Sequence, residues 1–342
     1  MEDIAPVAGP HPRTTSYLRL APTTLISLAH DHHIIIDRLR DGDPRTLARV
    51  ITAVENRTRG SAELLKALFP YTGHARVLGL TGAPGAGKST LVDQLAKYFR
   101  KRNEKVGIIA VDPTSPYTGG AILGDRIRMQ DHHADPGIFI RSMATRGSLG
   151  GLARTTADVA SVLDASGRDL VMIETVGVGQ DEIDIVRLAD ITVVILVPGM
   201  GDDVQSIKAG IMEIADIFVI NKSDRDGAEH VEREIRALQS LAARSDGWTP
   251  PIVKTIASEG RGVAELAQSI SGYESFLKKN NLARKRSIHN WKDRLVEMLR
   301  DAMLERARQE LTEDRLEAYA EEIVSHKRDP YTLIEEIVAT EN

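Results

Sequence analysis

Short apolar runs rich in β-branched residues alternate with helix-compatible stretches through the middle of the chain, from residue 76 onward. The runs are nearly continuous in apolar character, which is typical of parallel strands whose sheet is covered on both faces. Polar loops follow their carboxyl ends, where such sheets bind ligands. The pattern predicts an α/β domain with a mostly parallel sheet and seven strands: RVLGLT (76–81), KVGIIAV (105–111), GIFIR (137–141), DLVMIE (169–174), DITVVILV (190–197), DIFVIN (216–221) and IVKTI (252–256).

A helical pattern precedes this region. Asp43-Pro44 has the form of a helix start, with Asp as the cap and Pro at the first helical position. Residues 61–69 continue the helical pattern. We therefore expect an irregular extension over residues 1–40 and a helical segment over 41–74. The apolar face of the first helix consists of Leu47, Val50, Ile51 and Val54.

Helical patterns return after about residue 278, so we place the main domain at 75–277 and a helical arm at 278–342. The basic stretch KKNNLARKRSIHNWK, residues 278–292, is interpreted as a solvated linker. Asp329-Pro330 begins a last helix. The apolar stripes of the arm fit either an intrachain core or a dimer contact. They are Ile288, Trp291, Leu295, Met298, Leu299 and Ala302, then Leu316, Tyr319, Ala320, Ile323 and Val324, then Leu333, Ile334, Ile337 and Val338.

Composition narrows the class of protein. Apolar residues make up 42% of the chain and aromatic residues 4%, so aliphatic side chains must fill the core. The net charge of −5 argues against a nucleic-acid-binding protein. The absence of cysteine excludes disulfides and thiolate metal sites and is compatible with a reducing cytosol, so we expect a cytoplasmic protein. No run of 18 apolar residues predicts a membrane span.

The stretch GAPGAGKS has the form of a phosphate-binding loop, G-x-x-x-x-G-K-[ST]. It follows the first strand and precedes LVDQLAKYF, a helical pattern, which is the context that the motif requires. Backbone N–H groups of such a loop surround phosphate, the lysine reaches the β- and γ-phosphates, and the hydroxyl binds Mg²⁺. The predicted loop residues are Gly82, Ala83, Pro84, Gly85, Ala86, Gly87, Lys88, Ser89 and Thr90.

The stretch NKSD, at the end of the sixth strand, has the form N-K-x-D. The carboxylate of Asp224 would accept hydrogen bonds from guanine N1–H and the 2-amino group, which adenine does not offer. Leaving that acid unpaired in a buried site would discriminate against ATP. Lys222 would lie along the base and Asn221 would brace the loops, so the motif favours GTP and GDP.

Two acids end strands near the phosphate loop. Asp112 and Glu174 suit the binding of Mg²⁺ through its waters or the orientation of the attacking water. A helix cap or a loop salt bridge is the alternative for either acid. Asp125 lies in a glycine-rich stretch, where it fits either the metal shell or a plain surface acid.

The chain resembles the MeaB/ArgK family of P-loop GTPases, which includes the human methylmalonic aciduria type A protein. The resemblance runs from about residue 40 to the end. It is carried by GAPGAGKST, VDPTSPYTGGAILGDRIRM, RGSLGG, ETVGVGQ, GDDVQSIKAGIMEIAD and NKSD. It implies a G domain of the SIMIBI class with an N-terminal helical extension and a C-terminal dimerisation arm. It also implies a partner, an adenosylcobalamin-dependent acyl-CoA mutase such as methylmalonyl-CoA mutase, whose cofactor delivery the GTPase gates and which it protects.

The resemblance also assigns roles. Lys88 and Ser89 hold phosphate and Mg²⁺, Asp112 and Asp125 belong to switch I, and Glu174 belongs to the Mg²⁺ shell. Lys208 lies in a third switch, residues 199–208, that contacts the partner. Switch II corresponds to Val176, Gly177, Val178, Gly179 and Gln180.

Two positions depart from familiar patterns. Val178 stands where many GTPases carry a water-orienting glutamine, so slow intrinsic hydrolysis accelerated by a partner is expected. Ile256-Ala257-Ser258 stands where the family often has Ser-Ala-x. The Ala257 N–H is expected to meet guanine O6, while the supporting serine bond is lost.

A metal-insertion GTPase and an ATP-using kinase are alternative functions that find less support in the sequence. A metal-insertion GTPase would need ligands, and His30, His32, His33 and His132-His133 are the candidates. Adjacent histidines do not easily face one ion, and no cysteine is present. An ATP-using kinase of a transport binding protein is opposed by NKSD and by the lack of a loop resembling H-R-D.

Overall fold

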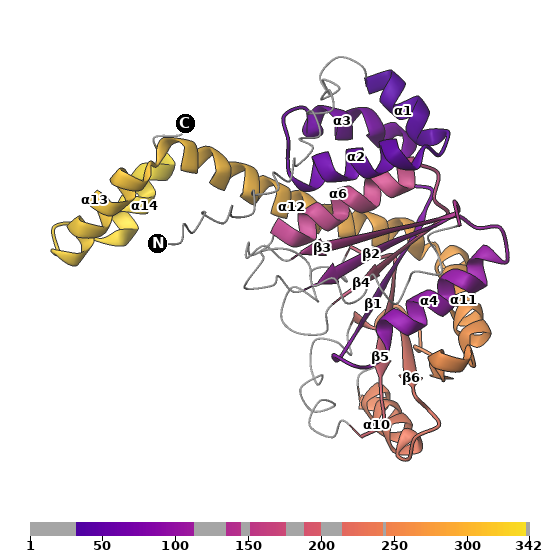
Figure 1. The fold of residues 1–342 in the computed structure, drawn as a ribbon. Helices are drawn as coiled ribbons and strands as arrows, with labels where there is room; N and C mark the ends of the chain where they lie inside the picture. Colours follow the sequence, from indigo (N-terminus) through magenta and orange to yellow (C-terminus); the bar gives the residue numbers. More distant parts are fainter. Residues whose placement is uncertain are drawn as a thin grey trace, which may run out of the picture.

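The computed structural model of the protein describes residues 32–112, 135–144, 151–175, 188–199, 214–241 and 244–339. Its centre is a seven-stranded sheet in the order β3-β2-β4-β1-β5-β6-β7, with every ladder parallel (Figure 1). Every predicted strand is present, to within a few residues at its ends. The strands are β1 (Arg76–Gly82), β2 (Val106–Asp112), β3 (Ile138–Ala144), β4 (Leu170–Glu174), β5 (Ile191–Leu196), β6 (Ile217–Asn221) and β7 (Ile252–Thr255).

Helices cover both faces of the sheet, which is why its strands are apolar throughout. Helices α4 (Lys88–Arg100) and α11 (Val263–Lys279) pack on one face. Helix α6 (Gly151–Ala165) and the N-terminal helices pack on the other. Neighbouring residues of one strand serve opposite faces, as Ile108 and Ile109 of β2 do. Helix α10 (Ala228–Leu241) covers β5 and β6.

The N-terminal helical segment contains α2 (Pro44–Glu55), α3 (Ser61–Leu68) and the short η1 (Phe69–Tyr71). Asp43 caps α2 as predicted, because its side chain accepts the backbone N–H of Arg45 at 3.0 Å. The expectation of an irregular extension over 1–40 is wrong for residues 32–40, which form α1 (His32–Arg40). The physical reason is an apolar face of Ile35, Ile36 and Leu39 that is buried against α2 and α3.

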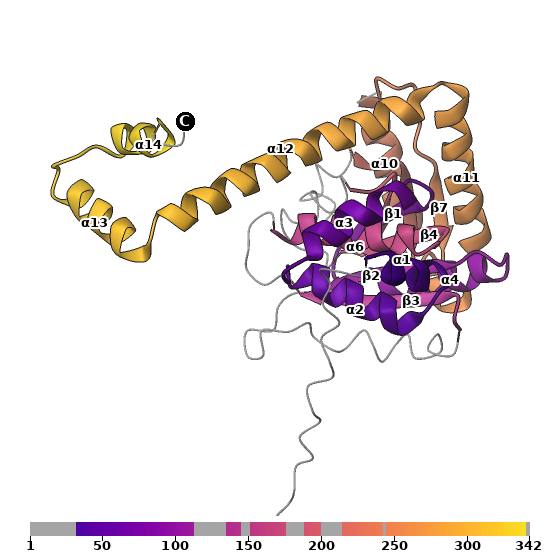
Figure 2. The ribbon, with the colours of Figure 1, turned by 90° about the horizontal axis from the view of Figure 1, so that it is seen from above.

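The C-terminal arm begins with α12 (Leu282–Glu310) and continues through α13 (Glu313–Val324) and α14 (Pro330–Ala339). Figure 2 shows α12 leaving the sheet domain as one long helix that carries α13 and α14 away from it. The interpretation of 278–292 as a linker is wrong, because α11 and α12 occupy this stretch apart from a short connection. The boundary placed at 277/278 falls inside the last turn of α11.

A buried carboxylate anchors the base of the arm. Asp216 is 0% exposed and accepts hydrogen bonds from Arg286 of α12 at 2.7 and 3.0 Å and from Arg244 at 3.1 Å. Tyr273 of α11 contacts the same Arg286. Burial opposes the charge of Arg286, but the Asp216 carboxylate outweighs it and holds the pKa of Arg286 above its usual range. The start of β6 and the start of the arm are therefore tied together.

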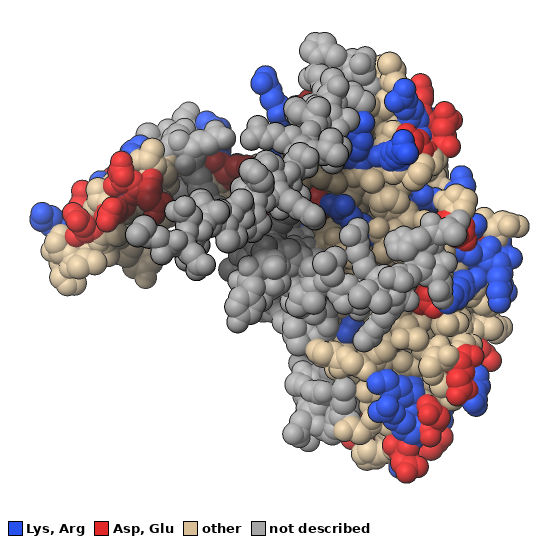
Figure 3. All heavy atoms as spheres, in the orientation of Figure 1, with Lys and Arg blue, Asp and Glu red and all other residues tan. Residues whose placement is uncertain are grey.

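On the face drawn in Figure 3, basic and acidic side chains are interspersed over the described surface. Among the described residues, no helix combines the length and apolar character needed to cross a membrane.

Candidate nucleotide site

The phosphate-loop sequence joins β1 to α4. Gly82 has a φ of 149°, and a Cβ there would collide with the carbonyl oxygen of Ile195 in the neighbouring strand. Lys88 is buried, and its Nζ donates to the carbonyl oxygens of Gly82 at 2.7 Å and Ala83 at 3.1 Å. The lysine therefore lies inside the loop, where a phosphate-binding lysine belongs.

Ser89 and Glu174 lie against each other at the carboxyl edge of the sheet. The Ser89 hydroxyl donates to Oε1 of Glu174 at 2.5 Å, and Glu174 is only 5% exposed. Glu174 ends β4, whose residues pair with those of β1, Leu80 lying opposite Glu174. A hydroxyl and a buried carboxylate are oxygen ligands of the kind that Mg²⁺ prefers, so this pair fits the ion.

Asp112 is the last residue of β2, and β2 pairs with β4. The backbone therefore brings Asp112 to the same edge of the sheet as Glu174. Asp125, the switch II stretch Val176–Gln180 and Lys208 lie outside the described residues. Their roles stay predictions.

Asn221 is the junction between the two nucleotide motifs. Its Nδ2 donates to the carbonyl oxygen of Ala86 at 2.8 Å, within the phosphate loop. Its Oδ1 accepts from the hydroxyl of Thr255 at 3.0 Å and from the N–H of Ala257 at 3.1 Å. A Cβ at Gly87, whose φ is 87°, would collide with the Asn221 amide. The base-reading loop and the phosphate loop are thus held at a fixed separation.

The other residues of NKSD lie nearer the surface. Lys222 has a φ of 55° and donates from Nζ to the carbonyl oxygen of Gly85 at 2.7 Å. Asp224 is exposed, as is Ser258. The expectation of a buried Asp224 is therefore wrong for the chain alone, since only a bound base would exclude water from this carboxylate.

The departure at Ile256 has a structural answer. Thr255, one residue earlier, supplies a hydroxyl that donates to Oδ1 of Asn221 at 3.0 Å, so a side chain of this loop still supports the base-reading motif. The N–H of Ala257 donates to Asn221, so the guanine O6 contact expected of this amide stays a prediction.

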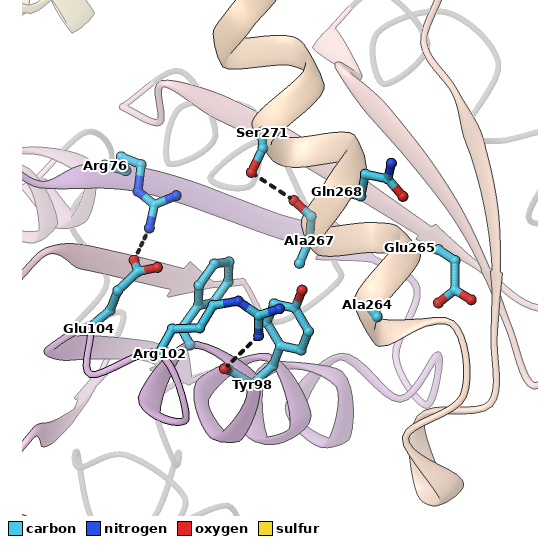
Figure 4. Close-up of a pocket in the computed structure, with 10 residues that line it drawn as sticks. Arg76, Tyr98, Arg102, Glu104, Ala264, Glu265, Ala267, Gln268 and Ser271 are labelled. Carbon is cyan, nitrogen blue, oxygen red and sulfur yellow. Dashed lines mark hydrogen bonds and ion pairs between the residues drawn. The ribbon is translucent and has the colours of Figure 1, made fainter.

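A groove of about 480 Å³ lies between α4 and α11, away from these motifs (Figure 4). It is lined by Arg76 at the start of β1, whereas the phosphate loop follows the end of that strand, roughly 20 Å away at the rise of a β-strand. Of its two arginines, Arg76 pairs with Glu104 and Glu274, and Arg102 lies over the ring of Tyr98. The groove is separate from the nucleotide site.

Residues 47–312 match the family model described as methylmalonyl Co-A mutase-associated GTPase MeaB. The chain belongs to the MeaB family. This match confirms the family predicted from the motifs, and with it the P-loop GTPase fold.

MeaB-family relatives are found in archaea, bacteria and animals. A putative GTPase of Pyrococcus abyssi is 55% identical over 249 residues, which cover 72% of this chain and 77% of that protein. The GTPase ArgK of Escherichia coli is 41% identical over 252 residues, covering 71% and 76%. The methylmalonic aciduria type A homolog of Mus musculus is 39% identical over 214 residues, covering 61% and 52%. The chain is therefore a GTPase.

A solved structure described as LAO/AO transport system kinase has a TM-score of 0.69 to this chain at 28% identity. The match covers 90% of this chain and 97% of that one. The mouse relative is named as mitochondrial, and the cytoplasmic location of the present chain stays a prediction.

Sequence reasoning missed the residues that support the MeaB-type site. Thr255, Thr175 and Thr81 are buried at the carboxyl ends of strands. The Thr255 hydroxyl donates to Asn221, and the Thr175 hydroxyl donates to Thr81. Their only signal in the sequence is a threonine at the polar end of an apolar run. Asp216 and Arg286 are 70 residues apart, and no motif links them.

Proposed function

We propose that this GTPase is a chaperone that gates adenosylcobalamin delivery to an acyl-CoA mutase, such as methylmalonyl-CoA mutase, and protects that mutase. The observation that carries the proposal is the match of residues 47–312 to a family described by its association with that mutase. A GTPase site assembled from Lys88, Ser89, Glu174 and Asn221 supports it.

The nucleotide is GTP or GDP, bound with its phosphates on residues 82–90 and its base on Asn221, Lys222, Asp224 and the 256–258 loop. On nucleotide binding, Lys88 would replace its hydrogen bonds to the carbonyl oxygens of Gly82 and Ala83 with bonds to phosphate oxygens. Little movement of the side chain is needed, because it already lies inside the loop. The separation fixed by Asn221 suits one ligand that spans both loops. This positioning favours a bound nucleotide over free phosphate or free base.

Mg²⁺ would be held by Ser89 and Glu174, with Asp112 at the same edge of the sheet. When bound, the ion neutralises charge on the phosphates. The short Ser89–Glu174 bond orients the hydroxyl, since its proton points to the carboxylate and its lone pairs are left for a cation. Glu174, buried beside the loop, places its carboxyl group close to where a cation is needed.

Partner control of hydrolysis rests on the switch residues. Val178 has no hydrogen-bonding group with which to orient water, so the isolated GTPase should turn over slowly. We assign the contact with the mutase to residues 177–180 and 199–208, and Lys208 is the candidate to carry the signal. The second candidate is the ATP-using kinase considered from the sequence, because the related solved structure is described as a transport system kinase. The preference for GTP or ATP separates the two candidates.

The first test is association with purified methylmalonyl-CoA mutase. The GTPase, loaded with GDP or with a non-hydrolysable GTP analogue, is mixed with the mutase and analysed by size-exclusion chromatography with light scattering. A complex whose amount depends on the nucleotide is expected. The absence of any complex in both nucleotide states contradicts this partner.

A further inference from the structure

Two buried hydroxyl groups join the strand that carries Glu174 to the strand that enters the phosphate loop. The Thr175 hydroxyl donates to the hydroxyl of Thr81 at 3.1 Å and lies 3.5 Å from the carbonyl oxygen of Leu80. Thr175 is 2% exposed and Thr81 is 1% exposed. A hydroxyl pair in an apolar sheet is costly to separate, because water cannot replace the lost bond.

This hydroxyl pair lies next to the metal-binding pair of residues. Thr175 follows Glu174 directly, and its N–H donates to Leu80 at 3.1 Å, which continues the β1–β4 pairing one step past the acid. Thr81 precedes Gly82, the residue whose carbonyl holds Lys88. The two strands are thus fixed to each other at the point where one delivers the acid and the other delivers the loop.

The contact that depends on this alignment is short. Ser89 of α4 and Glu174 of β4 meet at 2.5 Å, so the position of β4 relative to the strand that enters the phosphate loop sets this contact. The hydrogen bonds of the Thr175 hydroxyl run to Thr81 and to the carbonyl oxygen of Leu80, and Thr175 directly follows Glu174. We therefore expect Thr175 to act on the site through the position of Glu174.

We propose that Thr175, through its bond to Thr81, is a positioning residue for the Mg²⁺ site of Ser89 and Glu174. The inference rests on the proposed binding of magnesium and guanine nucleotide. It predicts that the hydroxyl of Thr175 governs magnesium affinity and leaves the contacts to the base unchanged. A purely structural hydroxyl bond would affect stability without changing the response to magnesium.

The test measures the release of a fluorescent GDP analogue from the full chain as free Mg²⁺ is raised from EDTA to millimolar concentration. In the wild type, magnesium slows release, and the midpoint of that effect reports magnesium affinity. Thr175→Val keeps the shape and removes the hydroxyl. Its midpoint should rise about fivefold, the size of one hydrogen bond, while the release rate in EDTA stays within about twofold.

Matched variants separate positioning from packing. Thr175→Ser restores the hydroxyl and should return the midpoint to within about twofold of wild type. Thr192→Val removes a buried hydroxyl from the neighbouring strand β5, and its midpoint should equal that of the wild type. Thr81→Val removes the other half of the bond, so it should shift the midpoint as Thr175→Val does, and the double variant should add little more.

An unchanged midpoint in Thr175→Val and Thr81→Val overturns the proposal, and so does an equal shift in Thr192→Val. If Thr175→Val does not fold, Thr81→Val carries the same test from the other strand. If magnesium does not change the rate at which the wild type releases the GDP analogue, the magnesium assignment is overturned, and the positioning role with it. Failure of the analogue to bind at all would contradict the proposed nucleotide site.

Discussion

Asn221 carries more of the site than its place in a four-residue motif implies. Its amide donates to Ala86 in one loop and accepts from Thr255 and Ala257 in another. The sequence predicted that this residue braces the loops, because its type and spacing belong to a known motif. Thr255 could not be predicted in the same way, since its role depends on which side chain its hydroxyl meets in the fold.

We propose that Asp224 decides the choice of base. We expect GTP to bind at least about tenfold more tightly than ATP, because only guanine offers two donors to this carboxylate. Asp224→Asn should weaken GTP by a similar factor and admit xanthosine nucleotides, whose 2-oxo group accepts from an amide. Calorimetry with GTP, ATP and a xanthosine nucleotide measures these affinities.

Asp226→Asn, at a neighbouring exposed acid, is the control for charge and should leave all three affinities unchanged. Equal affinity of the wild type for GTP and ATP is the result that sinks the guanine assignment.

At the scale of elements, the strands were predictable and the start of the arm was not. Continuous apolar runs such as DITVVILV reflect burial on both faces, which is a local property of the sequence. The stretch 278–292 is basic and reads as solvated, yet it forms the end of α11 and the start of α12. Arg286 forms an ion pair with Asp216, which directly precedes the distant strand β6. The composition of the stretch 278–292 holds no information about that pairing.

The Asp216–Arg286 contact should matter for stability. Arg286→Met removes charged hydrogen bonds to a carboxylate that is 0% exposed, so we expect a loss of about 1–3 kcal/mol in the free energy of unfolding. Urea unfolding of the nucleotide-free protein provides the measurement. Lys285→Met, at the adjacent exposed position, should change it by less than about 0.5 kcal/mol. Equal stability of Arg286→Met and wild type would show that Arg244 alone satisfies Asp216.

The whole molecule is a sheet domain from which a helical arm extends, and apolar residues form a stripe along that arm. Ile288, Leu295 and Leu299 are 58%, 58% and 62% exposed, so the chain's own core does not cover this stripe. The intrachain alternative left open by the sequence is therefore wrong for these side chains. Exposed apolar residues in a row along a helix favour a protein contact.

We predict a homodimer formed through residues 283–342. Leu295→Glu combined with Leu299→Glu should convert the dimer to a monomer, because each would place a charge in the apolar contact. Light scattering gives the mass directly, and Lys292→Glu on the same helix is the control. These substitutions are preferable to truncation at residue 280, which would remove Arg286 and leave Asp216 without it. A wild-type protein that is monomeric at micromolar concentration contradicts the dimer.

The most direct test of the central claim is steady-state GTP turnover with and without purified methylmalonyl-CoA mutase. We expect the GTPase alone to turn over slowly and turnover with the mutase to be at least about tenfold faster, because the partner would order the attacking water that Val178 cannot orient. Lys208→Ala should lose most of that acceleration, and unchanged stimulation would remove Lys208 from the mechanism. The proposed function would be contradicted if no adenosylcobalamin-dependent mutase raised the turnover of the wild-type GTPase above its rate alone.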